Sequence, residues 1–229
     1  MSGRNAQLPE VERERKPLAL LGVAIPVGLL VAVAGLFLFA WLAEEVMENN
    51  TRRFDAAVRD WVHQYSSPSM TSVAKTVSWL GEYGVAMAFV IALVVFLVLR
   101  WHRAAIWLTV TLAGALVLDM SLKYAFHRQR PTPFFVALPH TYSFPSGHAL
   151  FSFCFYGVLA GLIADRVKSR TVEVCVWVAA GLLIAAIGLS RIYLGVHYPT
   201  DVIGGYVAAA VWVSSMIAFD HVRARKRKT

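Results

Sequence analysis

The stretch LALLGVAIPVGLLVAVAGLFLFAWLA, residues 18–43, contains no charged residue and decides the class of fold. A helix needs roughly 20 mostly apolar residues to cross a hydrocarbon layer about 30 Å thick, because it rises about 1.5 Å per residue. Five further apolar runs follow it, at residues 83–99, 104–124, 148–164, 172–189 and 202–219. We therefore predict an all-α, polytopic membrane protein with six transmembrane helices.

The composition agrees with this class. Of the 229 residues, 58% are hydrophobic and 16% are charged, whereas a soluble domain carries about a quarter charged residues. This excludes a disordered chain, a collagen-like repeat and a disulfide-stapled secreted domain, and it disfavours an ordinary soluble enzyme. We expect a single domain over residues 1–229, which includes a cytoplasmic N-terminal segment (1–16) and a basic cytoplasmic tail (221–229).

The basic residues between the apolar runs predict the orientation. They occur in four groups. Arg13, Arg15 and Lys16 precede the first run, and Arg100 and Arg103 lie between the second and third. Arg166, Lys168 and Arg170 lie between the fourth and fifth, and the sixth is followed by Arg223, Arg225, Lys226, Arg227 and Lys228. With six spans all four groups fall on one side, which the positive-inside rule makes cytoplasmic. We expect an integral protein of the cytoplasmic (inner) membrane with both termini inside. The basic tail would contact anionic lipid, and no nucleic-acid partner is expected.

The longest segment on the opposite side covers residues 44–82. Within it, apolar residues recur at helical spacing: Phe54, Ala57, Val58, Trp61, Val62 and Tyr65. This pattern predicts a short helix. The helix either lies in the membrane interface or packs on the bundle as a lid, and both interpretations stay open.

Three clusters of reactive side chains lie at the predicted outer ends of the helices. The first contains Lys123, Arg128, Arg130 and Pro131, the second is Pro145-Ser146-Gly147-His148, and the third contains Ser190, Arg191, His197 and Asp201. The chain between the second and third clusters is long enough for one helix down and one back. All three clusters should therefore meet at the periplasmic or external face.

The residue types in these clusters suit phosphate. Lys123, Arg130 and Arg191 are cations at a membrane boundary, where a cation is costly without an anionic partner or water. An arginine fork matches phosphate oxygens, and lysine supplies a compact charge. Ser146 and Gly147 precede a helix, whose free N–H groups favour an anion. The predicted ligand is a tetrahedral oxyanion.

The two histidines predict the reaction. Asp201 lies four residues after His197, so its carboxylate can accept the imidazole N–H and leave the other nitrogen free to attack. His148, at a helix N-terminus, can protonate a leaving oxygen. Together with the cations, these groups would transfer a phosphoryl group without metal or cofactor. Three further residues have auxiliary roles: Asp119, Arg128 and Ser190. Asp119 is expected to form an ion pair with Lys123, and a direct contact with substrate is the alternative. Arg128 is expected to contact phosphate or a lipid headgroup.

These clusters resemble the signature of the type-2 phosphatidic acid phosphatase superfamily. Its pattern is Lys, six residues, Arg-Pro; Pro-Ser-Gly-His; and Ser-Arg, five residues, His, three residues, Asp. The match runs from Lys123 to Asp201, about a third of the chain, with every spacing kept. The resemblance implies that His197 forms a phosphohistidine, that Asp201 orients it, and that His148 is the acid. It implies that Lys123, Arg130, Ser146, Gly147 and Arg191 bind the phosphoryl oxygens.

The expected function is therefore a metal-independent lipid phosphate or pyrophosphate phosphatase acting on the outer face. Its partners would be the lipid substrate and membrane lipids, with undecaprenyl pyrophosphate, phosphatidylglycerophosphate or phosphatidate as candidate substrates. A lipid phosphotransferase or a lipid A phosphatase would use the same phosphohistidine. A transporter or non-catalytic scaffold is the alternative from a different class, and turnover would distinguish it. The oligomeric state stays open.

Overall fold

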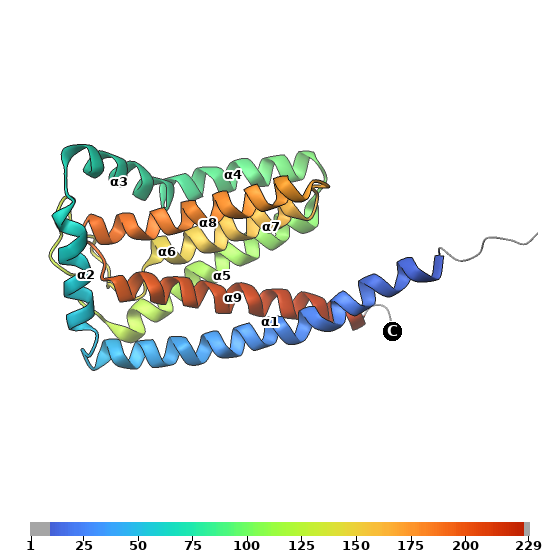
Figure 1. The fold of residues 1–229 in the computed structure, drawn as a ribbon, viewed down its shortest axis with the longest axis horizontal. Coiled ribbons are helices and arrows are strands. Elements are labelled where there is room, and N and C mark those ends of the chain that lie inside the picture. Colours follow the sequence, from blue (N-terminus) through green and yellow to red (C-terminus); the bar gives the residue numbers. More distant parts are fainter. Residues whose placement is uncertain (1–9, 227–229) are drawn as a thin grey trace, which may run out of the picture.

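A computed structural model describes the backbone of residues 10–226 and the side chains of residues 28–220, 222 and 223. Every regular element in this part of the chain is helical. The long helices α1 (Glu10–Met47), α5 (His102–Phe126), α8 (Arg170–Tyr193) and α9 (Pro199–Lys226) run side by side as a bundle (Figure 1). The predicted cytoplasmic segments 1–16 and 221–229 lie partly outside the described residues.

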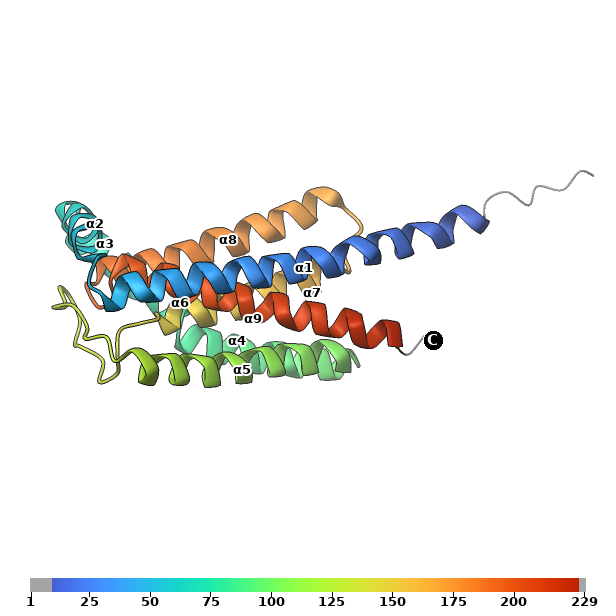
Figure 2. The ribbon, with the colours of Figure 1, turned by 90° about the horizontal axis from the view of Figure 1, so that it is seen from below.

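One helix occupies the centre of the bundle. It consists of α6 (Gly147–Ser152), the π-helical turn η1 (Phe153–Gly157) and α7 (Val158–Ala164), and it contacts α5, α8 and α9 (Figure 2). Leu150, Cys154 and Phe155 on this helix are fully buried. A single π turn inserts one extra residue per turn and rotates the side chains that follow it.

The outside of the bundle is apolar. Phe37, Val98 and Leu182 expose 73%, 75% and 67% of their surface. Such side chains are costly in water but cost nothing against lipid, and helices are suited to lipid because their backbone groups are hydrogen-bonded internally. Five helices of the described chain are long and apolar enough to cross a membrane. The protein is thus an integral membrane protein.

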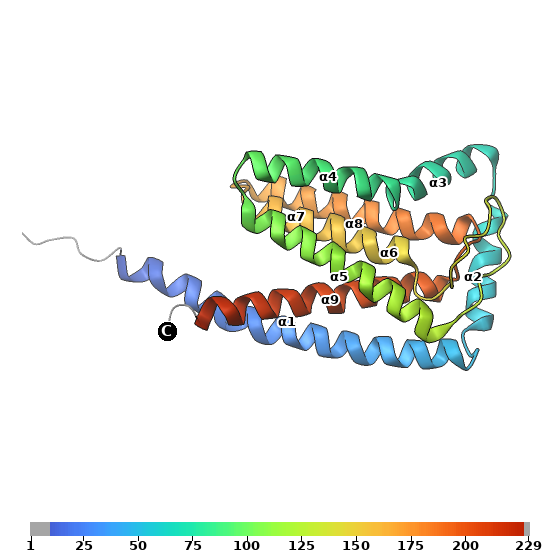
Figure 3. The same cartoon turned by 180° about the vertical axis from the view of Figure 1, so that it is seen from behind.

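The expected span at residues 83–99 has a different form. Helix α4 (Tyr83–Val98) has 16 residues, which at about 1.5 Å each reach only about 24 Å. Helix α3 (Pro68–Leu80), not predicted from the sequence, precedes it, and the two meet at a bend of 40° (Figure 3). Only as a pair do they reach spanning length, so the described residues contain five candidate spans, or six if the bent pair is counted as one.

The bend between α3 and α4 contains Gly81. A β-carbon there would lie 2.5 Å from Ile187 Cγ2 and 3.1 Å from His148 Cδ2. Contacts below about 3 Å require the neighbouring atoms to move. The bend can approach the α6 and α8 helices this closely because position 81 has no side chain.

The two ends of the bundle differ in charge. At one end the Arg166 guanidinium lies 4.0 Å from the Trp101 ring, and Arg103 pairs with Asp220. Three of the four basic groups therefore gather there, and we call this the basic end. The opposite end, here the site end, carries α2 (Arg52–Gln64) and the connection 127–146 (Figures 1 and 3).

Helix α2 lies across the site end, nearly at right angles to the bundle (Figure 1). It forms where the spacing of apolar residues predicts a helix. Phe54 and Trp61, however, are 50% and 59% exposed, whereas Asp55 is 1% exposed. The face of α2 toward the bundle thus contains the Asp55 carboxylate, although the spacing of the apolar residues places Asp55 on the polar side of this helix.

Candidate active site

The three clusters meet in one cavity at the site end. This cavity has a volume of about 490 Å³. Its polar lining includes six of the residues chosen from the sequence: Lys123, Arg130, Gly147, His148, Arg191 and His197. Segments far apart in the chain therefore present their cations and imidazoles to a common space.

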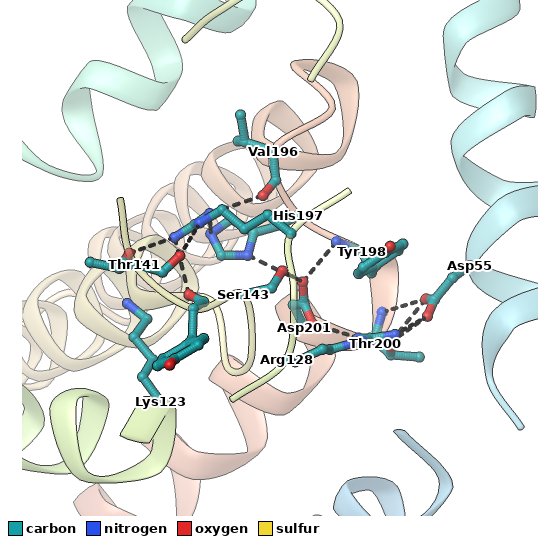
Figure 4. Close-up of polar contacts among 12 residues, drawn as sticks. Asp55, Lys123, Arg128, Thr141, Ser143, Val196, His197, Tyr198, Thr200 and Asp201 are labelled. Atoms are coloured by element: carbon teal, nitrogen blue, oxygen red, sulfur yellow. Dashed lines mark hydrogen bonds and ion pairs between the residues drawn. The ribbon is translucent and has the colours of Figure 1, made fainter. Parts of the chain in front are cut away.

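His197 lies between α8 and α9 and is 1% exposed. Its Nδ1 lies 3.3 Å from Asp201 Oδ2 (Figure 4). Its Nε2 lies 3.0 Å from Arg130 Nη1. A guanidinium can only donate hydrogen bonds, so Nε2 must carry the lone pair and Nδ1 the hydrogen. Burial lowers the pKa of His197 to about 3 although the Asp201 carboxylate opposes it. The imidazole is thus neutral, and its Nε2 lone pair points toward the Arg130 guanidinium.

Arg130 is fixed by the connection between α5 and α6. Its Nε donates to the Thr141 carbonyl (2.6 Å), its Nη2 to Thr141 Oγ1 (2.9 Å), and its Nη1 to the Val196 carbonyl (2.9 Å). Burial lowers the pKa of Arg130, and the carboxylates of Asp201 and Asp119 oppose that effect. The guanidinium stays a cation because its reference pKa is so high. It is held rigidly beside Nε2 of His197.

Lys123 and Asp119 form an ion pair on α5. The Lys123 Nζ lies 2.8 Å from Asp119 Oδ2, one helical turn away. Gly147 packs directly on this pair, since a β-carbon at position 147 would lie 3.1 Å from Nζ and 3.0 Å from Asp119 Oδ1. Oδ1 itself has no hydrogen-bond partner among the described residues. The ion pair and the start of α6 thus form one wall of the cavity.

His148 lies opposite Glu82 at the start of α4. Its Nε2 is 3.4 Å from Glu82 Oε2, and the Glu82 side chain is 57% exposed. Sequence reasoning did not select Glu82, which directly precedes an apolar run and belongs to no motif. The carboxylate can stabilise the protonated form of His148.

Arg191 on α8 is 7% exposed, and its Nη1 donates to Ser78 Oγ on α3. Its Nε has no partner among the described residues. Ser146 Oγ is likewise buried without a partner there. Ser190 Oγ, in contrast, donates to the Ile187 carbonyl 2.6 Å away on its own helix. Arg191 and Ser146 therefore retain binding capacity, whereas Ser190 is committed to its helix.

Arg128, which we expected to contact phosphate or a headgroup, is paired with two carboxylates in the structure. Its Nη1 lies 2.5 Å from Asp201 Oδ1 and its Nη2 lies 2.7 Å from Asp55 Oδ2. Both carboxylates are fully buried, so they attract the guanidinium more strongly than a solvated group at the surface does. Arg128 stands behind Asp201 and not in the cavity.

Several polar residues of the site were not selected from the sequence: Asp55, Ser78, Glu82, Thr141, Ser143 and Thr200. They lie in no motif, and all except Thr141, which contacts Arg130 within the same connection, reach the site through a contact with a distant part of the chain. Only Asp55 could have been recognised from the sequence as a possible site residue, because it lies in the helix predicted for the outer segment that covers the site end.

Comparison with known proteins agrees with this geometry. The model of the PAP2 superfamily matches residues 82–225. Phosphatidylglycerophosphatase B of Bacillus subtilis is 28% identical over 202 residues, 84% of this chain and 97% of that protein. Decaprenylphosphoryl-5-phosphoribose phosphatase of Mycobacterium tuberculosis is 32% identical over 169 residues, 70% and 87% of the respective chains.

A solved structure has the same fold. The crystal structure of a transmembrane PAP2-type phosphatidylglycerolphosphate phosphatase from Bacillus subtilis superposes with a TM-score of 0.76, at 25% identity, over 82% of this chain and 95% of that one. The match of the family model covers more than half of the sequence and includes all three clusters. The chain therefore belongs to the PAP2 superfamily.

Proposed function

We propose that this phosphatase hydrolyses a lipid phosphate or pyrophosphate on the outer face of the cytoplasmic membrane, through a phosphohistidine at His197. The observation that carries the proposal is the neutral imidazole of His197, whose Nε2 lone pair faces the cavity cations while Nδ1 is held by Asp201. A buried neutral imidazole with an oriented lone pair is a ready nucleophile.

In the first step the Nε2 lone pair attacks phosphorus, and the bond from phosphorus to the lipid oxygen breaks. His148 gives its proton to that oxygen, so the lipid leaves as an alcohol or as the shorter phosphate. In the second step His148 takes a proton from water, the oxygen attacks phosphorus, and the bond to Nε2 breaks. Inorganic phosphate leaves and both histidines return to their starting states.

The charge of the transferred group requires cations, and three are present. Lys123, Arg130 and Arg191 line the cavity that contains His197. We assign phosphoryl-oxygen binding to these three and to the Ser146–Gly147 backbone. Because positioned cations stabilise the charge of a phosphoryl transition state, the proposed reaction needs no metal.

The walls of the cavity suit a lipid. Apolar side chains of α4, α5 and the central helix continue the lining away from the cations: Val85, Ala86, Leu112, Leu116 and Phe151. A phosphate at headgroup depth would leave its tail against these helices, in the bilayer. The relatives named for phosphatidylglycerophosphate and for a decaprenyl-linked phosphate make both lipid classes candidate substrates.

The proposed orientation follows from the two ends of the bundle. The basic end, with Arg103 and Arg166, would be cytoplasmic by the positive-inside rule. The site end would then face the periplasm or the exterior. We propose that the whole chain acts as one such domain.

The test is phosphate release from each candidate lipid by purified protein in detergent with a chelator present. Trapping with a ³²P-labelled lipid should yield acid-labile label on the protein. His197→Ala should abolish both signals, and His102→Ala, an exposed histidine of the basic end, should change neither. Full activity in His197→Ala would contradict the mechanism. A newly phosphorylated acceptor lipid would identify a phosphotransferase instead.

A further inference from the structure

A buried chain of charges connects helix α2 to the proposed nucleophile. It begins at Asp55, which is 1% exposed. The Asp55 carboxylate accepts hydrogen bonds from the Thr200 backbone N–H (3.0 Å) and from Thr200 Oγ1 (2.9 Å) at the start of α9. It also accepts one from Thr51 Oγ1 (3.1 Å). Asp55 therefore ties α2 to the first turn of the helix that carries Asp201.

Arg128 forms the middle of this chain. Its guanidinium bridges Asp55 Oδ2 (2.7 Å) and Asp201 Oδ1 (2.5 Å), and its Nη1 also donates to Thr200 Oγ1 (2.8 Å) (Figure 4). The guanidinium carbon lies 4.2 Å from the centre of the Tyr198 ring. A planar cation held by two carboxylates and an aromatic face has little freedom to move.

Asp201 receives hydrogen bonds on both oxygens as a result. Oδ1 accepts from Arg128, whereas Oδ2 accepts from Ser143 Oγ, the Tyr198 N–H (2.8 Å) and His197 Nδ1 (3.3 Å). Contacts to both oxygens fix the plane of the carboxylate, and the carboxylate in turn fixes the ring of His197.

We propose that Asp55 and Arg128 are positioning residues for His197, which act through Asp201. This inference rests on the proposed role of His197 as the nucleophile. The Arg128 guanidinium pairs with the carboxylates of both Asp55 and Asp201, so its positive charge is divided between them. Without the Asp55 carboxylate, the guanidinium would pair with Asp201 alone. It would then draw electron density from the Asp201 carboxylate, which must accept the hydrogen of His197 Nδ1. It would also lose one of its two anchors, and the plane of Asp201 would be less well defined.

Attachment of α2 alone does not require Asp55. Arg59, on the same helix, donates to the Thr132 carbonyl at 2.8 Å and lies 4.8 Å from the centre of the Phe134 ring. Val62 packs against the buried residues of the α8–α9 connection. The helix should therefore stay docked when only the Asp55 charge is removed, which allows the positioning role to be measured separately.

The main test compares Asp55→Asn with Asp60→Asn. Asp60 lies on the exposed side of the same helix, so its variant controls for the loss of one negative charge. We expect Asp55→Asn to lower the single-turnover rate of His197 phosphorylation by about 10- to 100-fold, in the range found for residues that orient a reacting group. KM should change less than about threefold, because Asp55 does not reach the cavity. Asp60→Asn should match the wild type.

Two further measurements separate positioning from folding. The ¹⁵N chemical shift of His197 Nδ1 should differ between Asp55→Asn and the wild type. It is measured well below the unfolding temperature of the variant, where the protein is fully folded. Arg128→Lys, which keeps the charge but cannot bridge both carboxylates, should also slow phosphorylation. Wild-type phosphorylation rates and an unmoved Nδ1 shift in Asp55→Asn would overturn the proposal. Absence of phosphohistidine in the wild type would instead overturn the proposed function.

Discussion

The Glu82 carboxylate lies 3.4 Å from Nε2 of His148, although Glu82 lies in the turn between α3 and α4 and His148 lies at the start of α6. A carboxylate at this distance favours the protonated imidazole. His148 is the residue proposed to protonate the leaving oxygen, so Glu82 would keep its proton available. The exposed side chain of Glu82 lies at the bend between α3 and α4 and lines the cavity.

We expect Glu82→Gln to lower kcat/KM about 10-fold on a lipid phosphate, whose alkoxide leaving group needs a proton. On p-nitrophenyl phosphate, whose phenolate leaves without one, the loss should stay below about threefold. Steady-state kinetics on both substrates measures the difference. Glu48→Gln, an exposed glutamate after α1, is the control. Equal losses on both substrates would argue against a role in proton donation.

Gly147 should tolerate no side chain. A methyl group at this position would lie 3.1 Å from Lys123 Nζ and 3.0 Å from Asp119 Oδ1, so Gly147→Ala must displace the ion pair or the start of α6. A displacement of about 1 Å can cost about 100-fold in rate. The methyl group requires a shift of only a few tenths of an ångström, so we expect a smaller loss in kcat/KM, of about 10-fold. Gly181→Ala is the control, because no atom lies within 4 Å of its added methyl group. Similar activity of the two variants would refute this tight packing.

Ser78 should affect catalysis through Arg191. Its hydroxyl accepts from the Arg191 guanidinium, and a hydrogen bond to a charged group contributes about 1.5–3 kcal/mol. Ser78→Ala should therefore lower kcat/KM by about 10-fold, mainly by raising KM, because Arg191 would bind the phosphate less rigidly. Ser72→Ala, on the exposed face of the same helix α3, should leave both constants unchanged. An unaltered KM in Ser78→Ala would show that Ser78 does not contribute to substrate binding.

The protonation of His197 gives a pH dependence with a defined sign. Burial lowers its pKa in the folded protein to about 3, whereas an unfolded histidine has a pKa of about 6.5. Between these values the unfolded chain binds a proton that the folded chain does not, so this group makes the fold less stable as the pH falls from about 6.5 toward 3. Above pH 6.5 it contributes no pH dependence.

Two measurements check this expectation. The ¹⁵N spectrum of His197 in detergent should show the neutral imidazole, with hydrogen on Nδ1, down to about pH 4. The free energy of unfolding should depend less on pH in His197→Gln than in the wild type between pH 4 and 6.5. A titration of His197 near pH 6.5 would contradict the neutral buried state.

The sequence by itself determined the helical membrane class and the three clusters that meet at one end of the bundle. Hydropathy is a local property, so runs of apolar residues such as 104–124 predict helices directly. The pairing of His197 with Asp201 is likewise local, because His197 lies just before α9 and Asp201 lies in its first turn. The resemblance to a known family identified the same residues.

Only the tertiary structure decided which polar groups support those residues. Asp55 meets Arg128 across 73 positions of sequence, and Ser78 meets Arg191 across 113. Such pairings depend on how whole helices pack, and no periodicity records them. The structure also bends the helix pair at residues 68–98 and places Arg128 against the carboxylate of Asp201. The reason is electrostatic, since a buried carboxylate needs a cation beside it more than a solvent-facing phosphate site does.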